Sequence, residues 1–303
     1  MNVLVTGSSG FVGSHLVAAL LDAGMRVRAA GRRPPVCGGA EYCALPDVRG
    51  ADWAALVSGM DAVVHLAAAA HARGVGEMDL RQTNYEPVTA LCRALGSGQR
   101  LLFMSSIRAV SGSSSPDVIG DDSEPRPVCA YGKWKLAAEQ AVQNMLQRSA
   151  ILRPTTIYGA GAKDNMARLA AVARGPLPLP VAGLDAPRSY ASVQNVCAAA
   201  AFLLPEAASG TFIVSDPDVA SLRDLVVWLR QAAALPRRMF ALPVSLTKVT
   251  LGSRRLEELR KLACEPLVAR PTRLLAAGWR PEHLSSRDGV HRWARDGMGF
   301  ARL

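Results

Sequence analysis

The sequence predicts an α/β protein in which helices cover both faces of a doubly wound parallel sheet, with a smaller mixed α/β lobe attached. Three observations support this fold class. Short apolar runs alternate with stretches of helical period along the first half of the chain, which is typical of a parallel sheet. The first apolar run passes into a helical stretch through a glycine-rich turn. After Gly159 the composition shifts toward glycine, proline and arginine, which indicates that a second lobe begins there.

Length and composition indicate a globular protein with a large core, since 50% of the 303 residues are hydrophobic. The six cysteines are scattered with no C-x-x-C pair, which argues against a disulfide framework and a zinc site, so we expect no metal. No apolar run approaches ~18 residues, and no leader pattern precedes the first strand. We therefore expect no membrane association and a cytoplasmic location.

The chain has a net charge of +10, with 30 arginines and 5 lysines among its basic residues. From Arg237 onward, 14 basic and 6 acidic residues place +8 of this charge in the last quarter. One interpretation is a set of solvated faces in an arginine-rich chain. The other is a lobe that attracts a polyanionic substrate such as a nucleoside diphosphate. Sparse aromatic residues and the lack of a binding motif argue against nucleic acid as a partner.

The first strand, over residues 2–6, leads into a helix expected over residues 14–23 through a turn with three glycines. Gly7 lets the chain turn sharply off the strand, Gly10 has no Cβ to block a pyrophosphate, and Gly13 lets the helix approach the sheet. The free N–H groups and the dipole of the helix then face the anion. No Gly-Lys-Ser/Thr follows, so the turn predicts dinucleotide binding and not a nucleoside triphosphate loop.

The G-x-x-G-x-x-G spacing resembles that of the short-chain dehydrogenase/reductase superfamily, specifically its extended branch of nucleotide-sugar epimerases, dehydratases and reductases. The resemblance covers essentially the whole chain. It implies a Rossmann-type dinucleotide-binding domain over residues 1–158, rejoined by about residues 191–215. Residues 159–190 and 216–303 are then expected to form the substrate-binding lobe. Family members commonly dimerise through two helices, so the resemblance also implies a homodimer.

The end of the second strand, over residues 26–30, bears on the cofactor. Enzymes that use NAD place an acidic residue there to hold the ribose 2′-hydroxyl, whereas this chain has Gly31-Arg32-Arg33. Two guanidinium groups can pair with a 2′-phosphate that an acidic group would repel, so we expect NADP in preference to NAD. The alternative is that Arg32 and Arg33 only face solvent.

The third and fourth strands supply further cofactor contacts. Asp47-Val48 follow the third strand, where the resemblance implies contact with the adenine. The buried strand over residues 62–68 ends in small residues that let its backbone approach the cofactor. His65 within it is interpreted as a core histidine. In the next helical stretch, the resemblance implies that Asn84 ties the neighbouring strand to the active site.

The fifth strand, over residues 101–106, delivers two serines to its carboxyl end, where ligands bind in open α/β sheets. The resemblance implies that Ser106 hydrogen bonds to the substrate oxygen as charge develops on it. Gly112 lies six residues after Ser106, one more than is usual in the family, so the alternatives are Ser105 or a one-residue insertion before Gly112. Residues 111–127 are rich in turn formers and charge, and predict a mobile loop over the site.

A helix expected from Tyr131 to about Arg148 carries the predicted catalytic pair, because Tyr131 and Lys135 lie one turn apart on the same face. Tyr131 is the candidate acid and base for hydride transfer. Bringing the pKa of a phenol from ~10 to ~7 needs roughly 4 kcal/mol, which the Lys135 ammonium and an oxidised nicotinamide would supply. The resemblance implies that Lys135 also holds the nicotinamide ribose.

Beyond this helix, residues 151–159 resemble the family segment L-R-P…Y-G, which closes over the nicotinamide. Lys163-Asp164-Asn165 and Arg188-Ser189-Tyr190 look like the family's nucleotide-sugar contacts, with Arg188 as a diphosphate clamp. Residues 192–196 are expected to open a returning helix, residues 211–214 a further strand, and residues 274–281 match the family's closing L-G-W-x-P pattern.

The candidate site therefore comprises three sets of residues. The catalytic residues are Tyr131, Lys135 and Ser106. The cofactor-binding residues are Gly7, Ser9, Gly10, Phe11, Val12, Gly13, Arg32, Arg33, Asp47, Val48, Leu66, Ala67, Ala68, Asn84, Ser105, Tyr131, Lys135 and Pro154. The substrate-binding residues are Ser106, Arg108, Thr156, Asn165 and Arg188.

The two residues after Ser106 argue against one of the reactions that the family catalyses, dehydration. Family dehydratases place an Asp-Glu pair there for elimination, whereas this chain has Ile107-Arg108. Reduction of a 4-keto sugar fits NADPH, whereas C4 epimerisation normally retains NAD. Three segments look most like those of bacterial UDP-N-acetylhexosamine 4-reductases and 4-epimerases of surface-polysaccharide pathways. They are Ser-Ser-Ile-Arg at residues 105–108, Gly-Ala-Lys-Asp-Asn at residues 161–165 and Arg-Ser-Tyr at residues 188–190. We expect a UDP-sugar 4-keto reductase, with the 4-epimerase as the alternative.

Two other classes of function are weaker hypotheses. A reductase of apolar ketones would need an apolar substrate lobe, whereas this one is arginine-rich. A non-enzymatic NADP sensor on the same fold would generally have lost the tyrosine or the lysine of the catalytic pair.

Overall fold

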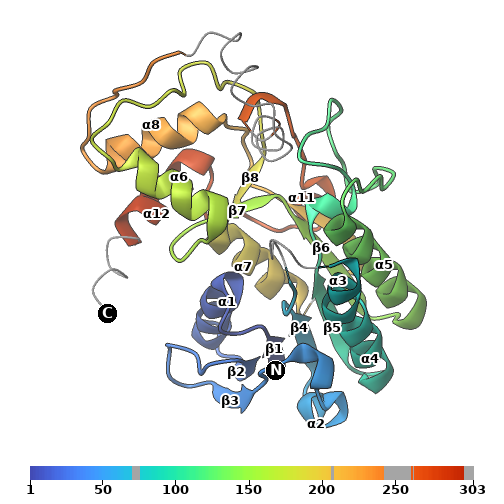
Figure 1. The fold of residues 1–303 in the computed structure, drawn as a ribbon. Coiled ribbons are helices and arrows are strands. Elements are labelled where there is room, and N and C mark those ends of the chain that lie inside the picture. The colour runs from blue at the N-terminus through green and yellow to red at the C-terminus, as the bar shows by residue number, and fades with distance from the viewer. Residues whose placement is uncertain (70–75, 206–207, 242–260, 262, 297–303) are drawn as a thin grey trace.

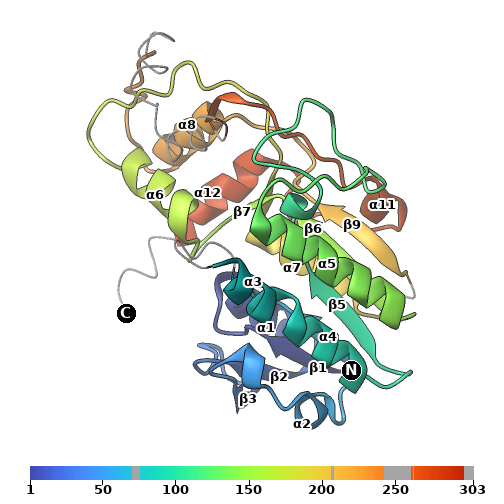
Figure 2. The same ribbon diagram turned by 45° about the vertical axis from the view of Figure 1, so that its right-hand side comes forward.

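The structure is a computed structural model that describes residues 1–69, 76–205, 208–241, 261 and 263–296. Its main feature is a seven-stranded parallel sheet with the strand order β3-β2-β1-β4-β5-β6-β9 (Figures 1 and 2). The strands are β1 Asn2–Thr6, β2 Arg26–Gly31, β3 Glu41–Ala44, β4 Ala62–His65, β5 Arg100–Met104, β6 Ser149–Pro154 and β9 Gly210–Val214. The predicted α/β class and doubly wound sheet are confirmed.

The strand order reverses beside β1. This strand pairs with β2 on one side and with β4 on the other, and both pairs are parallel. The chain therefore builds the sheet outward from β1 to β3, and then returns to build it from β4 to β9. Open α/β sheets bind ligands outside the carboxyl ends of the strands at such a reversal.

Helices cover both faces because successive side chains of a strand point to opposite sides of the sheet. Val3 and Val5 pack in a core with α1 and α7, whereas Leu4 packs in another with α4 and α5. The helices are α1 Phe11–Asp22, α2 Trp53–Val57, α3 Glu77–Asn84, α4 Glu86–Ala94, α5 Ala130–Met145 and α7 Val193–Leu203, with the short 3₁₀ helices η1 Val48–Gly50 and η2 Ile107–Ala109.

Two helix ends differ from the prediction. The first helix begins at Phe11, directly after Gly10, so the last predicted turn glycine lies inside it. The helix of the catalytic pair ends at Met145 and not at about Arg148. In both cases the hydrophobic period identifies the helix but not its terminal residues.

A third core lies above the sheet in Figure 1 and contains Tyr158, Leu229 and Trp293. Its elements, which we call the second lobe, are β7 Thr156–Tyr158, β8 Tyr190–Ser192, α6 Asp164–Ala173, α8 Leu222–Ala232 and α12 Ser286–Asp296. The short helix α11 Thr272–Ala276 packs beside β9. Part of the predicted substrate lobe, namely residues 242–260, 262 and 297–303, lies outside the described residues.

A buried carboxylate joins the sheet to the second lobe. Asp216 is 1% exposed and lies two residues after β9. Its oxygens accept hydrogen bonds from the Tyr158 hydroxyl at 2.6 Å, the Ser192 nitrogen at 2.9 Å, Asn195 Nδ2 at 2.8 Å and the Ser286 hydroxyl at 3.1 Å. Burial raises the pKa of Asp216, and these donors oppose the rise. Elements of both parts thus meet at one side chain.

The long loop before α5 is tied to distant parts of the chain. The Ile119 nitrogen donates to the Val268 carbonyl at 2.8 Å. The Asp121 carboxylate accepts from the nitrogens of Ile213 at 2.7 Å and Arg273 at 2.8 Å. The loop is therefore held against β9 and α11, and these contacts argue against the predicted mobility.

The described part of the chain has no helix that combines the length and the apolar character needed to cross a membrane.

Candidate active site

The glycine turn has the geometry that its sequence predicts. Gly7 has a φ of 70°, a conformation that favours glycine, and a Cβ there would lie 2.9 Å from the Ala67 nitrogen. A Cβ on Gly13 would overlap the carbonyl oxygen of Gly7. The turn therefore lies against the end of β4, and α1 lies against the turn.

The start of α1 fits an anion such as a pyrophosphate. Gly10 is the N-cap residue, no side chain caps the helix, and its first turn contains no acidic residue. The first N–H groups of a helix have no partner within it, and the helix dipole favours negative charge near them. The backbone of Phe11, Val12 and Gly13 would bind the phosphates there, with Ser9 beside it in the turn.

The end of β2 lies beside the same turn. A Cβ on Gly31 would lie 3.1 Å from the Ser9 nitrogen, so the following Arg32 and Arg33 start next to the predicted phosphate site. Both arginines are exposed. No carboxylate among the described residues forms an ion pair with either of them.

Asp47 and Val48, the predicted adenine contacts, lie at the start of η1, shortly after β3. The Asp47 carboxylate caps η1 by accepting from the Arg49 nitrogen at 3.0 Å, and it also pairs with the Arg49 guanidinium. Val48 is 8% exposed and belongs to the core of the sheet. The Arg49 hydrogen bonds lower the pKa of Asp47.

The exit of β4 is fixed by Asn84, whose side chain binds the backbone of Ala69 in both directions, at 2.8 Å and 3.1 Å. Leu66, Ala67 and Ala68 lie between this contact and β4, and are partly buried. His65 is fully buried, and its Nδ1 lies 3.0 Å from Thr6 Oγ1. Burial lowers the pKa of His65 to about 3, so it is the neutral core histidine that the sequence indicates.

Tyr131 and Ser106 meet at the carboxyl end of β5. Their side chains share a hydrogen bond, and Arg108 lies close enough for its charge to act on the phenol. Gly132 makes this approach possible, because a Cβ there would overlap the Arg108 carbonyl oxygen. The first turn of α5 therefore rests directly on η2.

The two serines at this end of β5 point to different partners. The Ser105 hydroxyl donates to Glu139 and is 4% exposed, whereas Ser106 contacts Tyr131. Of the two alternatives that the sequence left open, the geometry favours Ser106 as the residue beside the phenol.

The Lys135 ammonium is held at the end of β5. Lys135 is 2% exposed, its Nζ donates to the Met104 carbonyl at 2.9 Å, and it lies 4.7 Å from the centre of the Phe103 ring. Burial lowers the pKa of Lys135 to about 8, and the charge of Glu139 opposes the lowering.

The predicted lowering of the Tyr131 pKa depends on an oxidised nicotinamide as well as on Lys135, and it stays a prediction. Burial raises the pKa of Tyr131 to about 12, although the Ser106 hydrogen bond and the Arg108 charge each lower it. At neutral pH the Tyr131 hydroxyl carries its proton.

Arg188 is not the diphosphate clamp that the resemblance implied. Arg188 is 2% exposed, and its guanidinium donates to the carbonyls of Ser113 at 2.7 Å and Glu265 at 2.6 Å. With both terminal nitrogens bound to backbone carbonyls and only 2% of the residue exposed, the guanidinium is not placed on a surface that a diphosphate could contact. Arg188 instead holds the loop before α5 against the segment that contains Glu265.

The other predicted contacts lie on separate elements. Pro154 ends β6 and is buried, whereas Thr156 begins β7 and is partly buried. Asn165 is an exposed residue in the first turn of α6.

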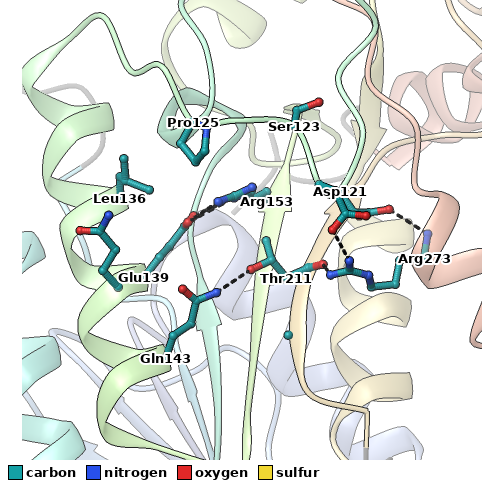
Figure 3. A pocket seen from close by; sticks show the side chains of 12 residues that line it. Asp121, Ser123, Pro125, Leu136, Glu139, Gln143, Arg153, Thr211 and Arg273 are labelled. Carbon is teal, nitrogen blue, oxygen red and sulfur yellow. Dashed lines mark hydrogen bonds and ion pairs between the residues drawn. The ribbon is translucent and has the colours of Figure 1, made fainter.

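The pocket in Figure 3 lies elsewhere. It is an open hollow with a volume of about 310 Å³, lined by α5, the loop at residues 121–125, the start of β9 and Arg273. Neither residue of the predicted catalytic pair lines it, nor does the glycine turn. The candidate active site is formed by the glycine turn, Ser106, Tyr131 and Lys135, whose geometry fits dinucleotide binding and proton transfer. The polar hollow in Figure 3 has no such arrangement.

A model of the NAD dependent epimerase/dehydratase family matches residues 3–214. The chain belongs to this family. It is an NAD(P)-dependent enzyme of the extended short-chain dehydrogenase/reductase type, which confirms the predicted resemblance.

Similar proteins differ in the reactions that their names give. UDP-glucose 4-epimerase from Vibrio cholerae is 31% identical over 264 residues, which is 81% of this chain and 79% of that protein. The 2-alkyl-3-oxoalkanoate reductase from Stenotrophomonas maltophilia (strain K279a) is 31% identical over 262 residues, 78% of this chain and 77% of that protein. The solved structure of MoeE5 in complex with UDP-glucose and NAD has a TM-score of 0.79 at 22% identity, over 99% of this chain and 100% of that one, and shows the shared fold.

Three features of the enzyme's site were not predicted from the sequence. They are the N-cap of α5, where Cys129 Sγ accepts from the Gly132 nitrogen at 3.4 Å, the close packing at Gly132, and the buried Glu139–Arg153 pair. Glu139 could have been found, because it follows Lys135 by four residues and so shares its helical face. Its partner Arg153 lies on the strand β6, outside this helix, and could not have been found in this way. Within the described residues, no three His, Cys, Asp or Glu side chains cluster as metal ligands would.

Proposed function

We propose that the enzyme reduces the C4 ketone of a UDP-4-keto-hexose, as a step in surface-polysaccharide sugar synthesis. The observation that carries this proposal is the pairing of Ser106 with a protonated Tyr131 at the carboxyl end of β5. Reduction of a ketone needs a proton donor beside the substrate oxygen, and the Tyr131 hydroxyl would supply it, with Ser106 as a second hydrogen-bond donor.

Three side chains take part in the proposed proton transfer to the substrate oxygen, namely Tyr131, Ser106 and Arg108. The nicotinamide, when bound, supplies the hydride. As C4 gains this hydride, the C4 oxygen takes the proton of the Tyr131 hydroxyl, and the ketone becomes a secondary alcohol. Ser106 hydrogen bonds to the same oxygen while negative charge develops on it. The charge of Arg108 stabilises the phenolate left on Tyr131.

The proposed cofactor is NADPH, with Lys135 holding its nicotinamide ribose. Support for the 2′-phosphate comes from the exposed Arg32 and Arg33 beside the glycine turn, and from the absence of an acidic residue at the end of β2. MoeE5 was solved with NAD, so the preference requires a direct measurement.

The UDP-sugar substrate is supported by the relatives, since one is named a UDP-glucose 4-epimerase and MoeE5 binds UDP-glucose. In this chain the proposed contacts are Arg108 near the reacting carbon, Thr156 on β7 and Asn165 on α6. We also propose a homodimer formed through α4 and α5, which pack against each other on one face of the sheet (Figure 1).

The name of the Vibrio cholerae relative favours a second candidate, a UDP-hexose 4-epimerase. Such an enzyme would begin by oxidising an alcohol, with Tyr131 as the base. The Stenotrophomonas maltophilia relative favours a third, the reduction of an oxoalkanoate. In all three candidate reactions Tyr131 would be the acid or base. The reactions differ in the substrate and in whether cofactor is consumed overall.

Incubation with NADPH and a panel of UDP-4-keto-hexoses, UDP-hexoses and oxoalkanoates tests the function, with products identified by NMR. We expect one UDP-hexose and one NADP⁺ for each UDP-4-keto-hexose consumed. Interconversion of two UDP-hexoses without net NADPH consumption would show the epimerase instead. Turnover of oxoalkanoates alone would contradict a nucleotide-sugar substrate.

Replacement of Tyr131 by Phe tests the mechanism on whichever substrate turns over. Turnover should fall by about 10²- to 10⁴-fold, the contribution of a positioned general acid, while the affinity for NADPH stays the same. The matched control is Tyr85→Phe, which keeps its ring contact with Trp134 and should retain wild-type turnover. An unchanged rate in Tyr131→Phe would remove Tyr131 from the mechanism.

A further inference from the structure

A buried ion pair lies between α5 and the sheet, next to the catalytic helix face. Glu139 is 1% exposed and Arg153 is 5% exposed. Arg153 donates to both carboxylate oxygens, with distances of 3.0 Å from Nε to Oε1 and 2.6 Å from the terminal nitrogen to Oε2. Figure 3 shows the two side chains directed toward each other from α5 and β6. Because buried ion pairs add little stability over apolar side chains of equal size, a role in the site is a better explanation.

The same carboxylate also holds the strand that carries Ser106. The Ser105 hydroxyl donates to Glu139 Oε1. Ser105 directly precedes Ser106 at the carboxyl end of β5. Glu139 therefore binds one neighbour on β5 and one on β6, and both contacts fix its position.

Lys135 lies one helical turn before Glu139 on the same face of α5. Its Nζ donates to the carbonyl of Met104, the residue before Ser105. The ammonium and the carboxylate thus bind two adjacent residues at the end of β5, Met104 and Ser105. Burial lowers the pKa of Lys135 to about 8, and the charge of Glu139 keeps it from falling further.

Other charged or titratable groups around Lys135 do not replace this carboxylate. His65 on β4 is neutral at pH 7, because burial lowers its pKa to about 3. Tyr131 on α5 keeps its proton there, because burial raises its pKa to about 12. Arg153 on β6 is positive and bound to Glu139. Among the described residues, Glu139 is therefore the negative charge that acts on Lys135.

We propose that Glu139 is a positioning residue that keeps Lys135 in its ammonium form, with Arg153 and Ser105 holding the carboxylate in place. The effect on turnover rests on the proposed function, in which Lys135 holds the nicotinamide ribose. The effect on Lys135 itself does not depend on the substrate.

An NMR titration of the lysines tests the proposal without any substrate. The chain has only 5 lysines, so protein labelled with ¹³C at lysine Cε gives few resonances, and loss of one signal in Lys135→Met identifies Lys135. In Glu139→Gln the midpoint of the Lys135 titration should fall by about 1 to 3 pH units, because an opposite charge one turn away is removed. A midpoint equal to that of the wild type would overturn the proposal.

Three further variants separate a charge effect from a structural one. Asp216→Asn also removes a buried carboxylate, but its hydrogen bonds lie in other elements, so it should leave the Lys135 midpoint unchanged. Glu139→Asp keeps the charge and should recover most of the shift. If Glu139→Gln does not fold, Glu139→Gln with Arg153→Gln removes both charges. The midpoint should then still lie below that of the wild type, by less than the loss of the carboxylate alone would give, because the positive charge of Arg153 is lost too. An equal shift in Asp216→Asn would mean general loss of structure and would overturn the proposal.

The pH profile of turnover connects this effect to the proposed function. The wild-type rate should fall above about pH 8, where Lys135 loses its proton, and this alkaline limb should move to lower pH in Glu139→Gln. If the NMR midpoint moves and the alkaline limb does not, the proposed role of Lys135 in catalysis fails, whereas the influence of Glu139 on Lys135 stands.

Discussion

Two exposed arginines at the end of β2 are the residues on which the choice of cofactor depends. Arg32 and Arg33 follow Gly31, whose missing side chain lets β2 end against the glycine turn. A guanidinium group pairs with phosphate through two parallel hydrogen bonds, and such a pair is stronger than a contact with a neutral hydroxyl. The position of these side chains matters here more than the net charge of the protein.

Replacing Arg32 and Arg33 together by Ala should weaken NADPH binding by about 10- to 100-fold, or about 1.4 to 2.8 kcal/mol, and change NADH binding little. Fluorescence titration of both cofactors measures this. Arg26→Ala is the matched control, because Arg26 is exposed at the other end of the same strand. Equal affinity of the wild type for the two cofactors, unaltered in the double variant, would contradict the proposed preference.

Glycines at the junctions between elements determine how closely the elements of the site approach each other. Gly13 lets α1 rest on the turn after β1, and Gly132 lets α5 rest on η2. In both places a backbone carbonyl lies where a Cβ would be. The phosphate site and the catalytic site therefore depend on the same kind of contact.

Gly13→Ala tests this at the level of one helix. The added Cβ meets the Gly7 carbonyl, which belongs to backbone and cannot rotate away. We expect a loss of about 1 to 3 kcal/mol in the free energy of unfolding and weaker cofactor binding. Denaturant unfolding and cofactor titration measure these. Gly98→Ala is the control, since nothing lies within 4 Å of its added Cβ, and stability as low as in Gly13→Ala would count against the packing argument.

The pattern of neighbouring residues in the sequence was enough to predict the helices and strands. The partners of individual side chains could be identified only in the structure. The β-branched runs and glycine spacing identified the strands and the phosphate turn, because both depend on neighbours in sequence. Arg188 was misassigned because the carbonyl of Ser113 lies 75 positions away in the chain. The helical period placed Lys135 on the correct face but could not show that its Nζ binds the Met104 carbonyl. The loop before α5 was predicted to be mobile because its long-range partners leave no local signal.

At the scale of the whole molecule, Asp216 connects the sheet to the second lobe. It accepts hydrogen bonds from Tyr158, Ser192, Asn195 and Ser286, which belong to four different elements. A site built between two parts of a protein requires a fixed relation between them. This buried carboxylate provides one such constraint, away from the reacting groups.

Asp216→Asn should lower the free energy of unfolding by about 1 to 3 kcal/mol, because an amide nitrogen would replace one acceptor among buried donors. Thermal unfolding measures the change. The control is Asp185→Asn, which removes an exposed ion pair with Arg223 and should change stability by less than about 1 kcal/mol. Wild-type stability in Asp216→Asn would show that the network does not join the two parts.

The order in which the strands enter the sheet has a consequence during synthesis. β9 pairs with β6 only after the chain has formed β7, α6, β8 and α7 in between. Until residue 214 has left the ribosome, the nascent polypeptide carries β6 as an open edge, to which the backbone of another unfinished chain can add. A truncated product that stops before β9 keeps that edge permanently, so early termination yields an aggregation-prone species and not a smaller working enzyme.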